Sequence, residues 1–362
     1  MPFGQALFFY QRSEEVIMIR AAIIGATGYT GLELVRILSA HPGVTITVAT
    51  SRQYEGQPLH KVFPLLSGSV DIVCQSLSPE RVSGAADVVF LAIPHQTAMT
   101  YVPIFLQANK KVIDLSADFR LKDVRVYEKW YQAHSASEYL AEAVYGLPEI
   151  HAAEIKTARL VANPGCYPTT VILGLAPLLK KGLIGNKSIV VDSKTGVSGA
   201  GRSAVLSSLF CEVHEDVKAY KVAAHRHTPE MEQELSLLAG EELTITFIPH
   251  LVPMGRGMLS TIYADLKGQQ TTGDLISEYE EFYHQAPFVK ICAEGAYPQT
   301  AHVKGSNYCF IGLKVDERTG RVVILSAIDN LAKGASGQAV QNMNLMFGLE
   351  ETTGLKEIPL FP

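Results

Sequence analysis

A short apolar run followed by a glycine-rich turn limits what this chain can fold into. Residues 19–24, IRAAII, have the length and composition of a buried strand, and GATGYTG follows them directly. The next segment, LELVRILSA, places apolar side chains at helical spacing, and VTITVATS at 44–51 is rich in β-branched residues. A strand, a tight turn, a helix and a second strand within about thirty residues predict a β-α-β unit with parallel strands.

Later segments extend this pattern and then change character. DVVFLAI at 87–93 and KVIDLS at 111–116 have the composition of strands, and the stretch at 95–108 between them is helical in pattern. We therefore expect a doubly wound α/β domain. The second half contains β-rich segments at 188–196, 242–252, 259–266, 308–317 and 321–328. The sequence DERTGRVV connects the last two of these segments and is typical of a β-hairpin turn. We therefore expect an α+β domain with a mostly antiparallel sheet, followed by a helix over 331–348.

The size and composition of the chain exclude several classes of protein. Its 362 residues are enough for two domains, and its net charge of -5 comes without a basic block, so we expect no nucleic-acid partner. No apolar run approaches the roughly 20 residues of a membrane span, and we expect no membrane partner. Residues 1–17 do not resemble a signal peptide and are interpreted as an N-terminal extension. Five widely spaced cysteines indicate a reducing, cytoplasmic location rather than disulfides or a metal site.

Three glycines lie between the first strand and the first helix. Gly25, Gly28 and Gly31 have the spacing G-x-x-G-x-x-G. Glycines at this position let the chain turn sharply and bring backbone N–H groups close to a dinucleotide pyrophosphate. The alternative is a turn whose glycines serve packing alone. The strand–turn–helix context favours dinucleotide binding.

Ser51 and Arg52 end the second strand, where an NAD enzyme usually carries an acidic residue. A hydroxyl and a guanidinium suit a 2′-phosphate, because arginine makes bidentate, charge-assisted contacts with it. The alternative is a solvated surface arginine. The pair favours NADP over NAD as the cofactor.

The stretch NPGCYPTT, 163–170, contains a cysteine in a predicted turn, with a proline on either side. Pro168 suits the first turn of a helix, so Cys166 is predicted to open a helix through VILGLAPLL. A helix N-terminus lowers a thiol pKa and favours the nucleophilic thiolate. An inert buried cysteine is about as common, and a matching base elsewhere in the chain would decide between the two.

The candidate base lies in AAHRHTPEMEQEL. His225 and His227 are two residues apart and face the same way if the segment is extended. We expect a helix to follow, with Thr228 as its N-cap and Pro229 at its first position. One histidine would act as general acid and base beside a thiol. The alternatives are a structural histidine or half of a metal site, but no third ligand has suitable spacing.

Two loops are candidates for ligand contact. DLSADFR, 114–120, leaves a strand of the first domain and delivers Arg120 beyond its carboxyl end, where such sheets bind ligands. Arg120 suits a substrate carboxylate or phosphate, or forms an ion pair with Asp114 or Asp118. KTGVSGAGR, 194–202, is either a loop that approaches a cofactor or substrate closely or a flexible hairpin.

Together these blocks resemble those of the N-acetyl-gamma-glutamyl-phosphate reductase family (type 1). The blocks are GATGYTG, TSR, DLSADFR, NPGCYPT, KTGVSGAGR, HRHTPE, PHLVPMGRG and DNLAKGASGQAVQNMN, and they cover the chain from Met18 to its end. That family belongs with the aspartate-semialdehyde and glyceraldehyde-3-phosphate dehydrogenases. The resemblance implies NADPH-dependent reduction of an acyl phosphate through a cysteine thioester, in arginine biosynthesis.

The resemblance also implies roles for individual residues. Cys166 would be the nucleophile and His225 the acid and base. The implied cofactor-binding residues are Gly25, Thr27, Gly28, Tyr29, Thr30, Gly31, Ser51, Arg52, Pro94, Ser198, Gly199, Asn330, Lys333 and Gly334. The implied substrate-binding residues are Arg120, Asn163, His227 and Arg256.

The implied domain plan is discontinuous. Residues 18–165 and 329–362 would form the NADP-binding Rossmann domain, and 166–328 the catalytic and oligomerisation domain. A homo-oligomer, dimer or tetramer, is expected. Two alternatives stay open: a reductase of a related acyl phosphate, N-acetyl-aminoadipyl or aspartyl phosphate, and a dinucleotide-binding sensor without catalysis.

Overall fold

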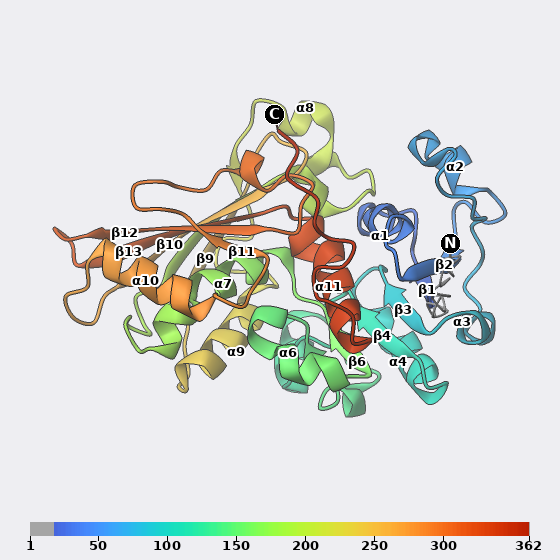
Figure 1. Cartoon of the computed structure of the whole chain (residues 1–362), viewed down its shortest axis with the longest axis horizontal. Helices are drawn as coiled ribbons and strands as arrows, with labels where there is room; N and C mark the ends of the chain where they lie inside the picture. Colours follow the sequence, from blue (N-terminus) through green and yellow to red (C-terminus); the bar gives the residue numbers. More distant parts are fainter. Residues whose placement is uncertain (1–17, 362) are drawn as a thin grey trace, which may run out of the picture.

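The computed structural model describes residues 18–361 and contains two sheets (Figure 1). The first is a six-stranded, wholly parallel sheet in the order β2-β1-β3-β4-β6-β5. Its strands are β1 (Ile19–Ile24), β2 (Val44–Thr50), β3 (Val88–Leu91), β4 (Lys111–Asp114), β5 (Val144–Tyr145) and β6 (Leu160–Ala162). The predicted doubly wound α/β domain is therefore confirmed.

Helices cover both faces of this sheet because successive strand residues point to opposite sides. Ile23 of β1 packs into the core under α1 (Tyr29–Ser39), α6 (Pro148–Thr157) and α11 (Gly337–Met346). Ile24, one residue later, packs into the opposite core with α3 (Pro79–Ala85), α4 (Ala98–Gln107) and α5 (Val124–Trp130). Helix α11, the last helix of the described residues, thus lies on the sheet built by residues 19–162.

The second sheet has seven strands in the order β11-β12-β13-β10-β7-β9-β8 and is mixed, with mostly antiparallel pairs, as expected. Its strands are β7 (Val190–Thr195), β8 (Lys218–Ala219), β9 (Thr246–Leu251), β10 (Met258–Asp265), β11 (Val289–Ile291), β12 (Cys309–Asp316) and β13 (Arg321–Ile328). The hairpin predicted at DERTGRVV joins β12 to β13, with Asp316 opposite Arg321. Only β7–β9 and β11–β12 are parallel pairs.

Helix α7 (Cys166–Lys180) connects the two parts of the molecule. It packs against β10 and β13 of the second sheet and against α9 (Thr228–Ala239), and almost all of its residues are buried. With α10 (Thr272–Phe282) it covers one side of that sheet (Figure 1). No helix within residues 18–361 combines the length and apolarity needed to cross a membrane.

Candidate active site

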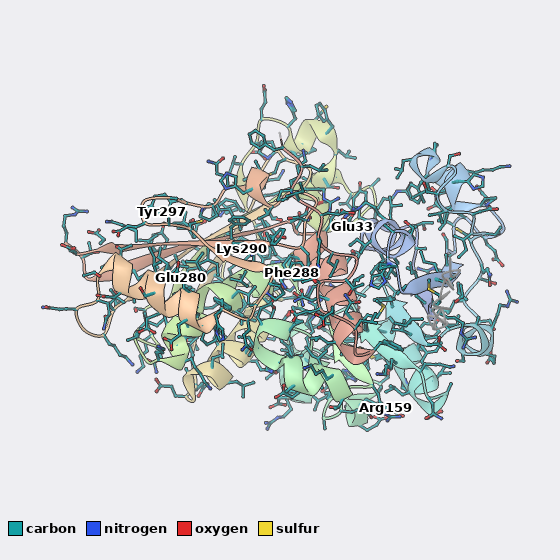
Figure 2. All side chains as sticks on the ribbon, in the orientation of Figure 1. Glu33, Arg159, Glu280, Phe288, Lys290 and Tyr297 are labelled. Carbon is teal, nitrogen blue, oxygen red and sulfur yellow. The ribbon has the colours of Figure 1, made fainter. Side chains whose placement is uncertain are left out.

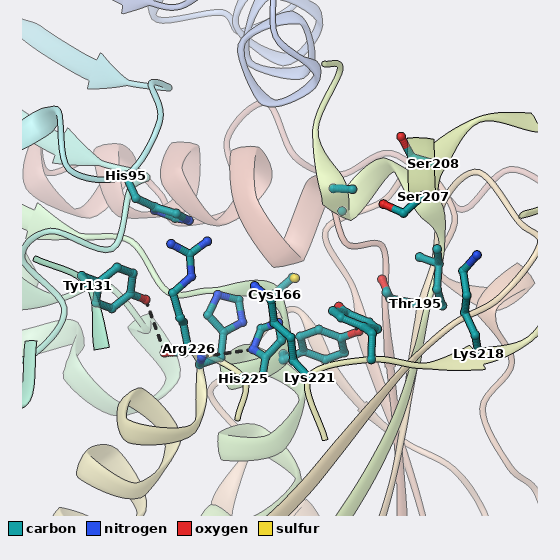
Figure 3. A pocket seen from close by; sticks show the side chains of 16 residues that line it. His95, Tyr131, Cys166, Thr195, Ser207, Ser208, Lys218, Lys221, His225 and Arg226 are labelled. Atoms are coloured by element: carbon teal, nitrogen blue, oxygen red, sulfur yellow. Dashed lines mark hydrogen bonds between the residues drawn. The ribbon is translucent and has the colours of Figure 1, made fainter. Parts of the chain in front are cut away.

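A cavity of about 450 Å³ lies between the two parts of the molecule (Figure 3). His95 and Tyr131 line it from the first part, and His225 and Lys218 line it from the second. The Cys166 sulfur lies between these two groups of side chains. The sequence-predicted thiol and histidine therefore share one cavity.

The turn before Cys166 accepts only a glycine at position 165. Gly165 is the N-cap residue of α7, which begins at Cys166 as the sequence predicted. A Cβ atom at Gly165 would lie 2.6 Å from His227 Nε2 and 2.9 Å from Arg120 Nη1. The His227 ring and the Arg120 guanidinium thus pack directly against the backbone of Gly165, next to Cys166.

A buried carboxylate holds this turn in place. Glu230 of α9 is 2% exposed and accepts hydrogen bonds from the Gly165 N–H at 2.8 Å and the Tyr145 hydroxyl at 2.9 Å. Its second oxygen pairs with Arg120 Nη1 at 3.2 Å. Arg120 also donates to the Asn163 carbonyl at 2.8 Å. Glu230 therefore connects the helix that follows the histidines to the turn that precedes Cys166.

The two histidines meet in a turn rather than in an extended segment. Lys221 and Ala223, just before them, take positive φ angles of 45° and 50°, a costly conformation for residues other than glycine. The His225 and His227 rings lie 4.8 Å apart. The expected N-cap is wrong by one residue: α9 begins at Thr228, and His227 is its N-cap residue.

The ring of His225 has a defined hydrogen-bonding direction. Its Nδ1 accepts the backbone N–H of His227 at 3.1 Å, so a neutral ring carries its proton on Nε2. Burial lowers the pKa of His225 to about 4, and the nearby charges of Lys221 and Arg226 act in the same direction. Burial also lowers the pKa of His227 well below its usual value. His225 and His227 are therefore neutral at pH 7.

Cys166 is also neutral in this site. Burial raises the pKa of its thiol to about 11, although the backbone N–H of Tyr167 and the charge of Arg120 act in the opposite direction. The helix N-terminus thus acts on the thiol as predicted, but burial outweighs it. The site pairs a thiol with an uncharged imidazole.

The segment after β13 returns to the thiol. Residues Ala332–Ser336 form a single π-helical turn directly before α11. A Cβ atom at Gly334 would lie 2.9 Å from the Cβ of Cys166, so this glycine allows the close approach. Asn330 donates to the Ser198 hydroxyl at 2.9 Å and accepts the Gly257 N–H at 2.8 Å. The predicted residues Gly334, Asn330 and Ser198 thus lie around one junction.

Lys333 does not reach a ligand-accessible surface. Its side chain is fully buried and its ammonium donates to Glu149 at 2.6 Å and Gln341 at 2.7 Å. The cofactor-binding role implied for Lys333 therefore has no support from its position. The residue instead ties the π-helical turn to α6 and α11.

Arg256 is likewise held by protein groups and does not line the cavity. It forms ion pairs with Glu33 at 2.8 Å and Asp329 at 2.9 Å. Glu33 lies on α1 at the boundary between the two sheets (Figure 2). Arg256 thus joins the two parts of the molecule, and its position does not support the substrate contact that the resemblance implied.

Asn163 and Arg120 lie under the cavity rather than on its wall. Asn163 is fully buried and donates to the Ala335 carbonyl at 3.1 Å. Arg120 is 4% exposed and pairs with Glu230, not with Asp114 or Asp118 as the alternative reading had it. Both predicted residues therefore support the backbone around Cys166 and do not line the cavity.

The glycine turn divides into packed and open positions. Gly25 has φ +92°, and a Cβ there would lie 2.3 Å from the Ala92 carbonyl oxygen. At Gly31 a Cβ would lie 2.1 Å from the Gly25 oxygen. At Gly28 a Cβ would meet nothing nearer than 3.6 Å. Packing explains the glycines at 25 and 31. At Gly28 there is space beside the backbone at the start of α1, and this space fits a bound pyrophosphate.

The other predicted cofactor residues surround this turn. Thr27 and Ser51 share a hydrogen bond of 2.9 Å, and Arg52 next to them is exposed. Tyr29 and Thr30 begin α1, and Thr30 accepts the Ser336 hydroxyl at 2.8 Å. Two predicted residues lie closer to the cavity: Pro94 directly precedes the lining residue His95, and Gly199 is itself a lining residue.

Several lining residues were missed by the sequence reasoning. Arg226 lies 5.2 Å from the centre of the Tyr131 ring, and it occurs in HRHTPE between the two histidines that were singled out. His95, Tyr131, Lys218 and Lys221 carried no signal beyond being polar residues in loops and short elements. Within the described residues, no group of three or more His, Cys, Asp or Glu side chains is placed to hold a metal ion.

Comparison with known proteins identifies the two parts of the molecule and its fold. Residues 20–158 match the semialdehyde dehydrogenase NAD binding domain, and residues 166–330 match the semialdehyde dehydrogenase dimerisation domain. Aspartate semialdehyde dehydrogenase II from Vibrio cholerae has the same fold, with a TM-score of 0.70 over 91% of this chain and 98% of that one, at 16% identity. The enzyme from Candida albicans, solved with NADP, has a TM-score of 0.67 over 91% of this chain and 98% of that one, also at 16% identity.

The two matched domains and the cysteine-containing cavity between them place the chain among the semialdehyde dehydrogenases. N-acetyl-gamma-glutamyl-phosphate reductase from Geobacter sp. (strain M21) is 58% identical over 346 residues, which are 95% of this chain and 100% of that protein. The enzyme from Desulfotalea psychrophila is 56% identical with the same coverage. The chain belongs to the family of N-acetyl-gamma-glutamyl-phosphate reductases.

Proposed function

We propose that this chain catalyses the NADPH-dependent reduction of N-acetyl-gamma-glutamyl phosphate to N-acetylglutamate 5-semialdehyde and phosphate, in arginine biosynthesis. One observation carries the chemical part of the proposal. Cys166 opens a buried helix inside a cavity that His225 also lines. Relatives that are 58% identical over 95% of the chain support the choice of substrate.

The first step is acyl transfer to Cys166. The sulfur attacks the γ-carbonyl carbon, the carbon–oxygen bond to the phosphoryl group breaks, and a thioester forms. The thiol loses its proton as the sulfur attacks, and the departing phosphate takes that proton up and leaves as hydrogen phosphate. The dense packing of Gly165 against His227 and Arg120 keeps the sulfur in position during the attack.

The second step is reduction of the thioester. The nicotinamide cofactor supplies a hydride when it is bound. His225 carries its proton on Nε2 and donates a hydrogen bond from it to the oxygen that becomes negatively charged when hydride reaches the thioester carbon. When the carbon–sulfur bond breaks, the negatively charged oxygen becomes the aldehyde carbonyl and the Cys166 sulfur leaves as thiolate. The released Cys166 sulfur is reprotonated from water.

The substrate carries negative charge at both ends, and the cavity carries positive charge on both sides of Cys166. Arg226 lies on the side of His95 and Tyr131, and Lys218 lies on the side of Ser207 and Ser208 (Figure 3). We assign the phosphoryl group to Arg226, whose planar fork suits it, and the α-carboxylate to Lys218, which would exchange its ion pair with Asp216 (3.2 Å) for the substrate. Arg120 contributes charge from beneath and positions the turn.

NADP is proposed as the cofactor of the NAD binding domain. Its support is the Thr27–Ser51 pair with Arg52 beside it, where a 2′-phosphate would be held. We further propose that 18–165 with 329–362 form one domain, because α11 packs against α1, α6 and β4. A cytoplasmic location is proposed from the free cysteines among the described residues.

The test uses the phosphate-dependent oxidation direction. We expect the wild-type protein to oxidise N-acetylglutamate semialdehyde faster than its one-carbon-longer homologue or aspartate semialdehyde, and NADP to outperform NAD. The variant Cys166→Ser should lose activity by several orders of magnitude while still binding NADPH. Wild-type turnover by this variant would eliminate the thioester, and a preference for another semialdehyde would redirect the substrate assignment.

A further inference from the structure

A segment of the dimerisation domain bridges the cavity and carries an exposed apolar ridge. This strap, residues 197–217, runs from the end of β7 to β8 and contains short helical turns at Leu206–Ser208 and Phe210–Val213. It forms the upper part of the second domain in Figure 1. It contains no strand; its residues 197–202 belong to the loop 194–202 that the sequence singled out, whereas 203–217 carried no prediction.

The inner side of the strap belongs to the active site. Ser207 and Ser208 line the cavity opposite Cys166 (Figure 3). Arg202 reaches the first domain, where it donates to the Thr27 carbonyl of the glycine turn at 2.9 Å and lies 4.7 Å from the centre of the Phe63 ring. A shift of the strap would therefore move a wall of the cavity and a contact to the cofactor turn together.

The outer side of the strap is apolar and uncovered. Leu206 is 72% exposed and Phe210 70% exposed, and Val205 and Leu209 beside them are also exposed. Four large apolar side chains within six residues form a patch of the kind that marks an interaction surface rather than scattered single exposures.

Little within one protomer fixes the strap. Between residues 203 and 217, each backbone–backbone hydrogen bond outside the helices joins two residues of the strap itself. Val213 is its one buried apolar anchor in that range. Segments with few buried apolar contacts and mostly local hydrogen bonds open at low free-energy cost. The wall of the active site thus depends on a weakly held segment.

We propose that a second copy of this chain docks on Leu206 and Phe210 and that this contact holds the strap in the position that completes the active site. The occupant is a second copy because the strap lies within residues 166–330, which match a dimerisation domain. Burying the ridge against a partner stabilises the strap by the hydrophobic effect, at about 25 cal/mol per Å² of apolar surface. The partner acts on the reaction through Ser207, Ser208 and Arg202.

The test compares Leu206→Asp/Phe210→Asp with the wild type by sedimentation equilibrium and by kcat/KM. The control is Leu237→Asp, since Leu237 is 64% exposed on α9 and faces solvent away from the strap. We expect the double variant to sediment at a lower mass than wild type and to lose kcat/KM by about tenfold or more, because a small displacement of a site wall has effects of this size. The control should match wild type in both.

Two results would overturn the proposal. An unchanged mass of the double variant would show that the ridge is not the interface. A lower mass with wild-type kcat/KM would show that the partner does not complete the site. Circular dichroism checks that the double variant is folded, and Leu206→Ser/Phe210→Ser repeats the experiment without buried charge. Sedimentation needs no substrate, so the interface is tested independently of the proposed reaction.

Discussion

Glu230 offers the sharpest test of how the site is held together. The substitution Glu230→Gln keeps the shape of the side chain and removes its charge. An amide oxygen at the position of Oε1 still accepts from Gly165 and Tyr145, but the amide NH2 then faces Arg120 Nη1, so two donors meet. The variant therefore breaks the buried ion pair selectively.

The size of the expected loss of stability follows from the burial of the Glu230–Arg120 ion pair. Glu230 and Arg120 are 2% and 4% exposed, so the arginine left behind cannot be solvated. Removing one partner of such a pair costs about 3–5 kcal/mol of the free energy of unfolding. Because Gly165 precedes the nucleophile, a displacement of about 1 Å would also lower kcat by about 100-fold.

The assay is urea unfolding followed by the fluorescence of Trp130, the single tryptophan of the chain, together with kcat in the oxidation direction. Glu280→Gln on the exposed side of α10 is the matched control and should stay within about 0.5 kcal/mol of wild type (Figure 2). Arg120→Met/Glu230→Gln should cost less than the sum of the single variants, since neither charge is then stranded. A loss below about 1 kcal/mol in Glu230→Gln, or additivity in the double variant, would refute this account.

Three further outcomes test other parts of the site. Gly25→Ala should lower the free energy of unfolding by about 1–3 kcal/mol or more, because φ there is +92° and the added Cβ would meet the Ala92 oxygen. Gly28→Ala should fold normally, because its Cβ would meet nothing nearer than 3.6 Å, but should bind NADPH more weakly in a fluorescence titration. Arg52→Ala should weaken binding of NADPH far more than that of NADH, and equal losses would remove Arg52 from the 2′-phosphate site. Iodoacetamide labelling of Cys166, followed by mass spectrometry, should accelerate about tenfold per pH unit from pH 7 to 10, because the pKa of its thiol is raised to about 11; a plateau near neutrality would contradict this.

Local signals were sufficient for the elements that carry the thiol and the glycine turn. Strands 19–24 and 321–328 have the predicted bounds, and α7 begins at Cys166 as predicted. In each case the boundary depends on residues next to it: a glycine or proline that ends one conformation and an apolar period that begins another. The N-cap of α9 was predicted one residue too late. The helix begins at Thr228 directly after the turn that contains His227, and no side chain caps its N-terminus.

Long-range pairing was not accessible from the sequence. Lys333 was expected near a cofactor, but it pairs with Glu149, which is 184 positions away. Arg256 was expected at the substrate, but its partners are Glu33 and Asp329. A lysine or arginine in a family block has the same local appearance whether it binds a ligand or a buried carboxylate. Only the folded chain shows which carboxylates come within reach.

The charge state of the site depends on the same long-range packing. A helix N-terminus favours thiolate, and that local argument was correct in direction, yet burial of Cys166 outweighs it. Burial of His225, which only the folded chain provides, lowers its pKa to about 4, and the charges of its sequence neighbours Lys221 and Arg226 act in the same direction. A cavity lined by Arg226 and Lys221, with a neutral thiol and a neutral imidazole, is suited to a ligand that brings its own negative charge. An acyl phosphate supplies that charge, and its departing phosphate takes up the proton that Cys166 loses as it attacks.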